Sequence, residues 1–303
     1  MRWRKLGHVY TAAGEAAWAR SHAFLPTVLP LDDERLRVYV AFLDKERIGR
    51  IGYVDVDASN PLRVLNVSQE PVLDIGIPGT FDDNGVNPIA VIREGDRIYL
   101  FYNGWQIPTR IRYTFFLGLA ISTDGGETFT RHSQVPVLDR ADGELYFRTA
   151  ACILRDEGKW RMWYIGGDQW VDVHGKLRPH YNMRYLESDR LDTWGAPGRV
   201  LIDVYGDDEH GLGRPVVIRD GNLYRMWYGV RTKSRGYHAG YAESPDGLVW
   251  RRRDELAGIE VSESGWDCEM LCCLAIQPTR YGTYMFYNGN NYGETGFGVA
   301  ILE

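Results

Sequence analysis

Residues 225–250, RMWYGVRTKSRGYHAGYAESPDGLVW, decide how the fold is interpreted, because each half of this stretch recurs along the chain. The first half, RMWYG, has a near copy at residues 161–166 and looser copies at residues 99–104 and 284–289. A more divergent fifth copy lies at residues 37–42. Successive copies are about sixty residues apart, and self-similarity at a fixed period indicates a repeat architecture. One aromatic position aligns the copies and is occupied by Phe42, Tyr102, Tyr164, Tyr228 and Tyr287.

The second half of the stretch, with the pattern G-x-A-x-S-x-D-G, recurs as well. Residues 118–125, GLAISTDG, match residues 240–247, GYAESPDG. A repeat therefore carries two signatures in a fixed order, an aromatic run and then a small-residue run that ends in a turn.

Each repeat begins with a short apolar run, such as residues 90–92, and a polar turn such as Glu94-Gly95-Asp96 follows it. Gly beside Asp between apolar runs is typical of a hairpin, because Gly supplies the positive φ that tight turns need. The aromatic run, a variable loop, a third apolar run and the Ser/Asp/Gly turn complete the repeat. We therefore predict an all-β fold, a five-bladed β-propeller with four-stranded antiparallel blades.

The two ends of the chain fit together in this scheme. The last repeat stops after its third strand, residues 297–302. Residues 4–10, RKLGHVY, are suited to supply its fourth strand, because an unpaired sheet edge leaves a row of backbone donors and acceptors exposed. No Pro/Gly/Ser-rich linker interrupts the sequence, so we expect residues 1–303 to form a single domain.

Composition narrows the function. A net charge of −6 argues against nucleic-acid binding, which usually needs a basic stripe. No apolar run is long enough to span a membrane, and the N-terminal residues lack the apolar core of a signal peptide. We therefore expect a cytoplasmic protein that binds neither nucleic acid nor membranes. The four cysteines lack zinc-site spacing, and nothing in the sequence indicates a metal or another cofactor.

Polar residues gather at one predicted face of the propeller. In a four-stranded blade, the start of the innermost strand and the hairpin between the second and third strands lie on the same face. Polar and charged residues occupy these positions in every repeat, which favours a site on loops held by a rigid scaffold. The candidates at strand starts are His22, Asp83, Asn87, Arg148, Glu209, His210, Arg214, Asp267 and Glu269. The candidates on hairpins are Trp105, Trp170, Arg231 and Tyr237.

Several of these residues are equally suited to a structural role. Asp82 and Asp83 fit the cap of a turn. Arg148 and Arg214 are as well suited to pair with Asp83 and Glu209 inside the protein as to contact a substrate, because structural ion pairs also cluster. The sequence leaves these alternatives open.

The turn S-x-D-G-G-x-T-F at residues 122–129 resembles the Asp box of sialidases, and residues 244–250 resemble it more loosely. Its Asp and Gly suit a β-turn, and it lies between third and fourth strands, away from the predicted site face. We therefore predict that it is structural. A sialidase would also need six blades and a three-arginine clamp, whereas five repeats are present.

Four runs carry a resemblance to a known group of proteins. These runs are GTFDDNGV at residues 79–86, WRMWY at 160–164, GWDCEM at 265–270 and MFYNGN at 285–290. They resemble hydrolase-like proteins of bacterial surface-polysaccharide gene clusters. More broadly, the whole chain resembles the five-bladed propeller glycoside hydrolases of families 32, 43, 68 and 130. The resemblance implies chemistry on glycosides.

The catalytic pattern of family 43 does not carry over intact. Those enzymes place an Asp on blade one, an Asp on blade two and a general-acid Glu on blade three. Here the first repeat offers His22 and the third offers Arg148 with Glu144 upstream. The second repeat alone matches, with Asp82 and Asp83.

Glycosyl transfer needs one protonated carboxyl group and one ionised carboxylate. The candidates are Asp83, Glu209, Asp267 and Glu269, and we expect Asp83 and Glu269 to form the pair. The residues expected to bind substrate are His22, Asn87, Trp105, Arg148, Trp170, His210, Arg214, Arg231 and Tyr237. The Arg and His residues favour an anionic substrate, since Arg binds such groups bidentately.

Two functions are therefore open. We predict a carbohydrate-active enzyme, a glycoside hydrolase, phosphorylase or transferase, whose substrate is a carbohydrate or an activated sugar. The alternative is a non-catalytic carbohydrate-binding propeller of polysaccharide metabolism, because the first repeat offers no acid at its strand start.

Overall fold

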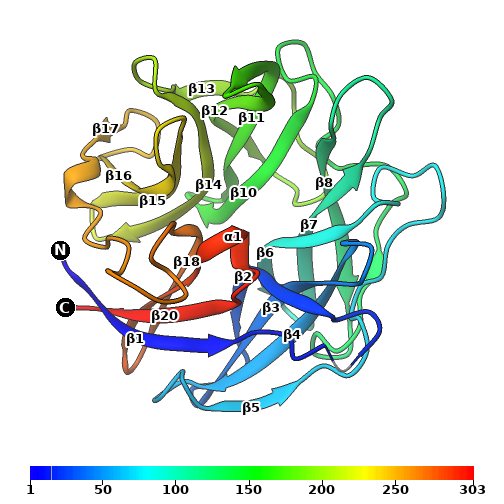
Figure 1. The fold of residues 1–303 in the computed structure, drawn as a ribbon, viewed down its shortest axis with the longest axis vertical. Coiled ribbons are helices and arrows are strands. Elements are labelled where there is room, and N and C mark those ends of the chain that lie inside the picture. The colour runs from blue at the N-terminus through cyan, green and yellow to red at the C-terminus, as the bar shows by residue number, and fades with distance from the viewer. Residues whose placement is uncertain (15) are drawn as a thin grey trace.

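The computed structural model describes residues 1–14 and 16–303, and the regular secondary structure of the described chain is almost entirely β-strand (Figure 1). The strands follow one another in groups of four, which we number as units. Unit 1 is β2 (Ser21–Pro30), β3 (Arg35–Leu43), β4 (Gly49–Asp57) and β5 (Val64–Val67). Unit 2 is β6 (Val86–Glu94), β7 (Arg97–Gln106), β8 (Thr114–Ser122) and β9 (Thr130–Arg131). Unit 3 is β10 (Phe147–Asp156), β11 (Lys159–Val173), β12 (Lys176–Ser188) and β13 (Arg199–Ile202).

The remaining elements complete two further units. Unit 4 is β14 (Glu209–Asp220), β15 (Leu223–Thr232), β16 (Gly236–Ser244) and β17 (Arg251–Arg252), followed by a short 3-10 helix, η1 (Asp254–Leu256). Unit 5 is β18 (Cys272–Thr279), β19 (Gly282–Asn288), β20 (Phe297–Leu302) and β1 (Trp3–Tyr10). The β19–β20 connection holds the short helix α1 (Asn290–Gly293), which Figure 1 shows near the middle of the molecule.

Neighbouring strands within each unit pair antiparallel, as the sequence predicted. Two short parallel contacts, β8 with β10 and β12 with β14, join units 2, 3 and 4 into one sheet of twelve strands. Units 1 and 5 are separate sheets of four strands. In unit 5, Trp3 of β1 lies opposite Leu302 of β20, so the expected pairing of the N-terminal strand with the last repeat is confirmed.

Packing continues round the molecule even where hydrogen bonding does not. Buried hydrophobic clusters lie at the junctions between successive units. At the junction of unit 5 with unit 1, Phe42 and Val54 pack with Phe286 and Phe297. The core is therefore distributed between the units rather than placed inside any one of them.

The aligned aromatic residues of the repeat are buried in the interior, and none is more than 1% exposed. The recurring Gly is explained by the same geometry. Gly118 lies opposite Tyr102, and Gly240 lies opposite Tyr228. A Cβ at these glycines would come within 2.4 and 2.5 Å of the tyrosine rings, so a larger residue does not fit.

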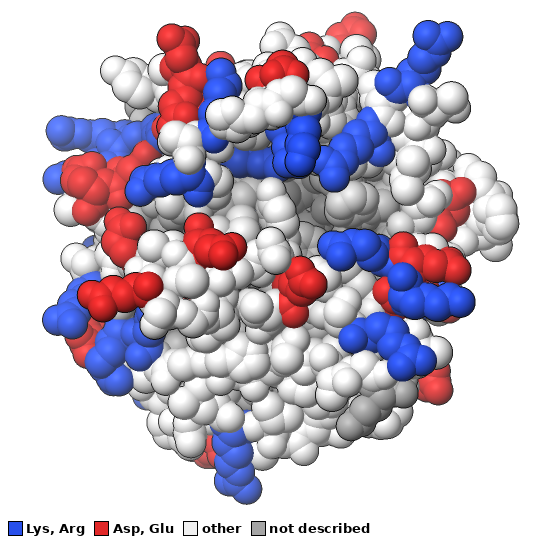
Figure 2. Space-filling model, in the orientation of Figure 1, with Lys and Arg blue, Asp and Glu red and all other residues white. Residues whose placement is uncertain are grey.

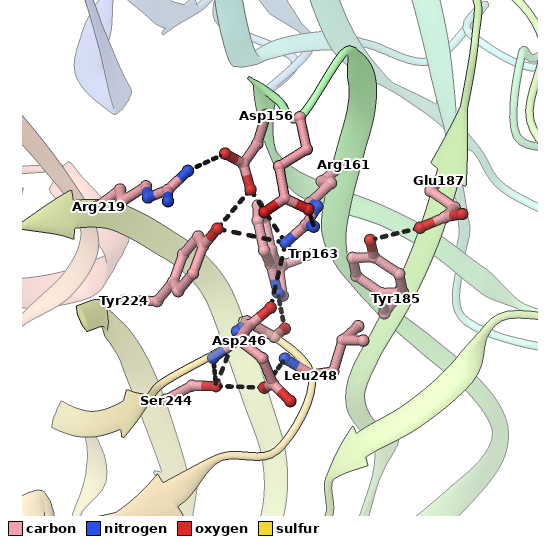
Figure 3. A network of polar contacts seen from close by, with 12 residues as sticks. Asp156, Arg161, Trp163, Tyr185, Glu187, Arg219, Tyr224, Ser244, Asp246 and Leu248 are labelled. Atoms are coloured by element: carbon pink, nitrogen blue, oxygen red, sulfur yellow. Dashed lines mark hydrogen bonds and ion pairs between the residues drawn. The ribbon is translucent and has the colours of Figure 1, made fainter. Parts of the chain in front are cut away.

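The Ser-x-Asp-Gly turns join neighbouring units. In the turn of unit 4, the Ser244 hydroxyl donates to Asp246, and Asp246 accepts the backbone N–H of Leu248 (Figure 3). The Trp163 indole of unit 3 donates to the Gly247 carbonyl at 2.8 Å, and Arg161 donates to the Asp246 carbonyl at 3.1 Å.

The turn of unit 2 repeats this arrangement. Arg37 and Tyr39 of unit 1 both donate to the carbonyl of Gly126. Both turns therefore hold the next unit against the previous one, as a structural role requires. No helix in the described residues is long and apolar enough to cross a membrane.

Candidate functional site

The strand starts and the hairpins meet at one end of the molecule, which we call the mouth. The backbone N–H of Asn84 donates to the Trp105 carbonyl at 3.1 Å, which joins the start of β6 to the β7–β8 hairpin. In unit 5, the Glu269 N–H donates to the Asn290 side chain at 2.8 Å. The molecular surface is hollowed near the middle of the face seen in Figure 2, and Lys and Arg side chains line one side of the hollow.

Each of the four aligned tyrosines donates a hydrogen bond to a carboxylate, and each of these carboxylates also pairs with a cation. We call this arrangement a clasp. In unit 2, Asp82 accepts the Tyr102 hydroxyl at 3.0 Å and the Arg131 guanidinium at 2.7 Å. In unit 5, Asp267 accepts the Tyr287 hydroxyl at 3.0 Å and the Lys5 ammonium at 2.6 Å.

The clasp of unit 3 is centred on Glu144, which is fully buried. Its two oxygens accept the Tyr164 hydroxyl, the Arg184 guanidinium at 2.9 Å and the Gly198 N–H at 2.8 Å, and Arg148 forms a further ion pair. A carboxylate with this many charged and neutral donors is held in one place.

A fourth clasp lies in unit 4, where Tyr228 donates to Asp254 at 2.7 Å and Arg252 pairs with Asp254. The same Arg252 pairs with Glu209 at 2.8 Å. Unit 1 has no clasp among the described residues, because Phe42 replaces the tyrosine. Its Ala19 follows Trp18, as Asp267 follows Trp266 in unit 5.

The clasps account for several candidate residues. Glu209 and Asp267 each hold a cation of their own unit. The ion pairs we considered for Arg148 and Arg214 are wrong in their partners: Arg148 pairs with Glu144 instead of Asp83. Arg214 donates to the carbonyls of Cys273 and Ile89 and to the Thr27 hydroxyl, and none of these is a carboxylate.

Asp83 and Glu269 are placed differently from the clasp carboxylates. Asp83 is partly exposed and accepts the Gly79 N–H at 2.8 Å and the Asn84 amide at 2.6 Å. The Glu269 side chain is exposed. Within residues 1–14 and 16–303, neither carboxylate is part of an ion pair. Asp83 is on the start of unit 2 and Glu269 is on that of unit 5.

The hairpins bring aromatic side chains together. Trp105 packs against Tyr113 and Phe115, with ring centroids 5.2 and 4.2 Å apart. Tyr113 also lies 5.3 Å from Trp170 of the β11–β12 hairpin. The Trp105 indole donates to the Asn87 side chain, so two candidates from the sequence are in direct contact.

Arg231 stands among tyrosines at the mouth. It donates to the Tyr292 hydroxyl at 3.0 Å and lies over the rings of Tyr237 and Tyr292. The Tyr237 hydroxyl is hydrogen-bonded to that of Tyr181. Burial raises the pKa of Tyr237 well above its usual value, so this phenol stays neutral.

Both candidate histidines are neutral at physiological pH. Burial, together with the charge of Arg47, lowers the pKa of His22 to about 4. Burial also lowers the pKa of His210 to about 4, against a hydrogen bond to the Pro179 carbonyl that favours its protonated form. His22 has a positive φ of 68°, a conformation that non-Gly residues rarely adopt and that often marks a functional position.

Arg214 fills the space where the inner strands of units 1, 2, 4 and 5 approach one another. Its three partners belong to β2, β6 and β18. Burial lowers the pKa of this guanidinium to about 10. Its partners are internal, so it supports the mouth from below.

Two cavities lie elsewhere. One, of about 500 Å³, is lined by Arg2, Trp3, Lys5 and residues 258–264. Another, of about 370 Å³, lies in unit 1 between Tyr10 and residues 67–69. Neither contains a candidate residue from the sequence. In the described part of the chain, no three His, Cys, Asp or Glu side chains are grouped as a metal site requires.

Sequence reasoning missed Tyr113, Tyr181 and Asp254. Tyr113 follows two arginines in a loop without a repeat signature, and Asp254 follows the last strand of its unit instead of preceding the first. Spacing gave no signal for Asp254, because Asp82, Glu144 and Asp267 each precede their tyrosine by 20 residues and Asp208 stands at that same spacing before Tyr228.

Solved structures define the fold. A structure from work on the GH130 family of mannoside phosphorylases, described as containing glycoside hydrolases that target β-1,2 mannosidic linkages, matches with a TM-score of 0.73 and 17% identity over 99% of this chain and 93% of that one. A glycoside hydrolase matches with a TM-score of 0.72 and 17% identity, covering 98% and 91%. A thermostable family-43 glycoside hydrolase matches with a TM-score of 0.69 and 16% identity, covering 97% and 91%. The fold is that of the glycoside hydrolase-like propellers.

Sequence relatives define the family. The Mycobacterium tuberculosis proteins named uncharacterized protein Rv1502 and uncharacterized protein MT1551, from two strains, are each 36% identical to this chain over 303 residues, the full length of both. The chain belongs to the family of these proteins. No family model matches it.

Proposed function

We propose that the five units are the blades of one five-bladed propeller, formed by residues 1–303 as a single domain, with β1 closing the last blade. The support is the continuous packing between successive units and the pairing of β1 with β20. In such a ring the five inner strands surround one axis, and the mouth is the end of that axis.

We further propose that the protein is a carbohydrate-active enzyme that cleaves or transfers a glycosyl group at the mouth. The observation that carries this is the contrast among the four candidate carboxylates. Glu209 and Asp267 are engaged by cations, whereas Asp83 and Glu269 have no ion-pair partner among the described residues and are open to a ligand. Free carboxylates at the end of a rigid scaffold suit acid and base roles.

The roles follow from these contacts. Asp83 and Glu269 are the proposed catalytic pair, and Glu209 and Asp267 hold the architecture on which they stand. Trp105, Trp170 and Tyr237 offer ring faces for a sugar. Polar contacts to a substrate come from His22, Asn87, His210 and Arg231. Two buried residues, Arg148 and Arg214, support the residues that contact the substrate. Likeness to glycoside hydrolases and to a phosphorylase family supports glycosides as substrates, and a cytoplasmic location stays a prediction.

The test is an NMR screen for new anomeric signals. Purified protein is incubated with oligosaccharides, sugar phosphates and nucleotide sugars, with and without phosphate. We expect a new anomeric doublet whose rate falls by roughly 10²–10⁴-fold in Glu269→Gln and in Asp83→Asn. Glu263→Gln, an exposed acid of the same loop, serves as the matched control and should keep the rate. Full turnover in both site variants would refute the carboxylate pair.

The anomeric configuration of the first product reports on the distance between the two carboxyl groups. Inverting enzymes hold their carboxyl groups roughly 6.5–9.5 Å apart and retaining ones about 5 Å apart. Because Asp83 and Glu269 come from different units, we expect the wider spacing and therefore an inverted product.

The second candidate function is a carbohydrate-binding propeller without catalysis. It is favoured by unit 1, which presents neutral His22 where family 43 enzymes carry an acid. A sugar whose signals broaden with the protein, without any new anomeric signal across the panel, would support this function over the enzyme.

A further inference from the structure

Four arginines of the described chain are almost fully buried: Arg37, Arg148, Arg214 and Arg231. Two of them have the partner that a buried charge requires. Arg37 pairs with Asp55 at 2.7 Å, and Arg148 pairs with Glu144. The other two have no carboxylate within ion-pair distance among residues 1–14 and 16–303. A buried charge without a counter-charge is costly, so these two arginines need an explanation.

Arg214 is explained by its hydrogen bonds. Its donors reach two backbone carbonyls and a threonine hydroxyl of three other units. Arg231, at 7% exposure, has phenol hydroxyls as its hydrogen-bond partners, those of Tyr292, Tyr113 and Tyr181. These hydroxyls are neutral and none of them is a counter-charge, although a guanidinium has five N–H donors to place.

The surroundings of Arg231 do not neutralise it. Burial raises the pKa values of Tyr113, Tyr181 and Tyr237, so these phenols carry no charge at neutral pH. His210 is neutral as well. The charged groups that act on His210 are Arg231, Arg178 and His180, and no acid is among them. Among the described residues, no carboxylate forms an ion pair with Arg231, and its neighbours here are neutral hydroxyl and imidazole groups.

One neighbour of the arginine reaches the surface. Tyr292, which accepts its hydrogen bond, is 39% exposed. The Tyr237 and Tyr292 rings lie 6.0 Å apart at 85°, so they form two walls beside the guanidinium. We define the cage as Arg231 with Tyr113, Tyr181, Tyr237 and Tyr292.

We propose that the cage binds an oxyanion of the substrate, the carboxylate of an acidic sugar or a phosphate group. Arg231 supplies the counter-charge and a planar pair of N–H donors, which match an oxyanion bidentately. The tyrosine hydroxyls supply further donors. This inference rests on the proposed function for the sugar portion of the ligand, but the anion site itself does not require turnover.

Binding of small anions tests the cage directly. Glucuronate, inorganic phosphate and neutral glucose are titrated at constant ionic strength, with saturation-transfer NMR for the sugars and ³¹P line width for phosphate. We expect glucuronate or phosphate to bind at least about tenfold more tightly than glucose, since a hydrogen bond to a charged group contributes about 1.5–3 kcal/mol. The anion that binds more tightly identifies the source of the oxyanion. Equal affinity for glucose and both anions would overturn the proposal.

Variants locate the site. Arg231→Gln should lose at least about tenfold in anion affinity, and Arg231→Lys should retain part of it. Arg235→Gln removes the same charge from an exposed position of the same hairpin and should bind as the wild type does. Arg231→Gln should also fold with an undiminished midpoint of thermal unfolding, because the buried charge that it removes has no ion-pair partner among the described residues. Unchanged anion affinity in Arg231→Gln would overturn the proposal.

The outcome separates this inference from the catalytic one. Glu269→Gln should bind the anion normally while losing turnover. Anion binding through Arg231 without turnover of any glycoside would support the anion site and refute the enzymatic function. Turnover of neutral glycosides, with no effect of Arg231→Gln on affinity or rate, would keep the enzyme and refute the cage.

Discussion

The clasps and the mouth contain the same kinds of side chain, but they differ in whether the charged groups are ion-paired. In the clasps, every carboxylate meets a tyrosine hydroxyl and a cation, as Asp82 does with Tyr102 and Arg131. At the mouth, Asp83 stands beside Asp82 in sequence, but neither Asp83 nor Arg231 forms an ion pair with any residue that the structure describes.

This difference teaches how to separate structure from function in a repeat protein. Charges that find each other inside the chain maintain the architecture. Charges that remain uncompensated in a rigid setting are available for something outside it.

The sharpest test compares two glutamates. Glu144→Gln breaks the contacts with two arginines, and we expect it to lower the free energy of unfolding by about 3–5 kcal/mol, because cations are left buried without a partner. Glu269→Gln alters an exposed side chain and should change it by less than about 0.5 kcal/mol. Urea unfolding followed by tryptophan fluorescence measures both. Equal losses would remove the distinction between clasp and mouth.

A second test uses two aspartates. Asp267→Asn weakens the contacts with Lys5 and Tyr287, and we expect a loss of about 1–3 kcal/mol, because a buried polar group loses a charged partner. Hydrogen exchange of the β1 amides should rise with it, since Lys5 belongs to β1. Asp83→Asn, the matched control, should leave β1 exchange unchanged.

The histidines of the mouth predict a dependence of stability on pH. His22 and His210 have pKa values lowered to about 4 in the folded state, against 6.5 as the ordinary value. The unfolded chain therefore takes up protons first as the pH falls. Stability should be full above about pH 6.5 and decline toward pH 4. Their charged neighbours are Arg47 and Glu294 for His22, and Arg178, His180 and Arg231 for His210.

Replacement of both histidines by Gln separates this effect from the titration of acids. The thermal midpoint of the double variant, measured across the same pH range, should fall less steeply than that of the wild type. An identical slope would show that the two histidines are not what titrates.

The smallest effect concerns the turns on the opposite face. Asp124 accepts two backbone N–H groups and the Thr128 hydroxyl, and its hydrogen bonds hold its pKa at about 2 against the opposing effect of burial. Asp124→Ala should cost about 1 kcal/mol and leave glycosyl turnover unchanged. A loss of turnover without a loss of stability would contradict the structural role of this turn.

The fold was largely predictable, and the reason is local. The aligned tyrosines, the glycines opposite them and the turns are each specified by neighbours in sequence, so the all-β repeat and the pairing of β1 could be predicted. Position 118 requires Gly because the Tyr102 ring lies against it, and this requirement appears in the sequence as a Gly that recurs in the repeats.

The sequence predicted a location for the candidate site, but it did not predict which of the site's residues have partners inside the protein. The sequence put Asn87 and Trp105 on one face, and the structure brings these two into contact. The sequence did not separate Asp83 from Asp82 or show that Arg148 pairs with Glu144. Those distinctions depend on which oxygen faces which hydroxyl or guanidinium, and the partners come from distant strands. Arg131, for example, is 49 residues from Asp82.

The pairing of β1 with β20 also sets an order of events during synthesis. Arg4 and Glu303, which contact each other at 2.6 Å, are 299 residues apart in the chain. A ribosome releases β1 first and its partner last, so β1 must wait with an unsatisfied edge while the other units assemble. Contacts this distant in sequence are slow to form, and exposed edges invite association with other chains. The pairing of β1 with β20 is therefore also the folding step at which association with other chains competes most strongly.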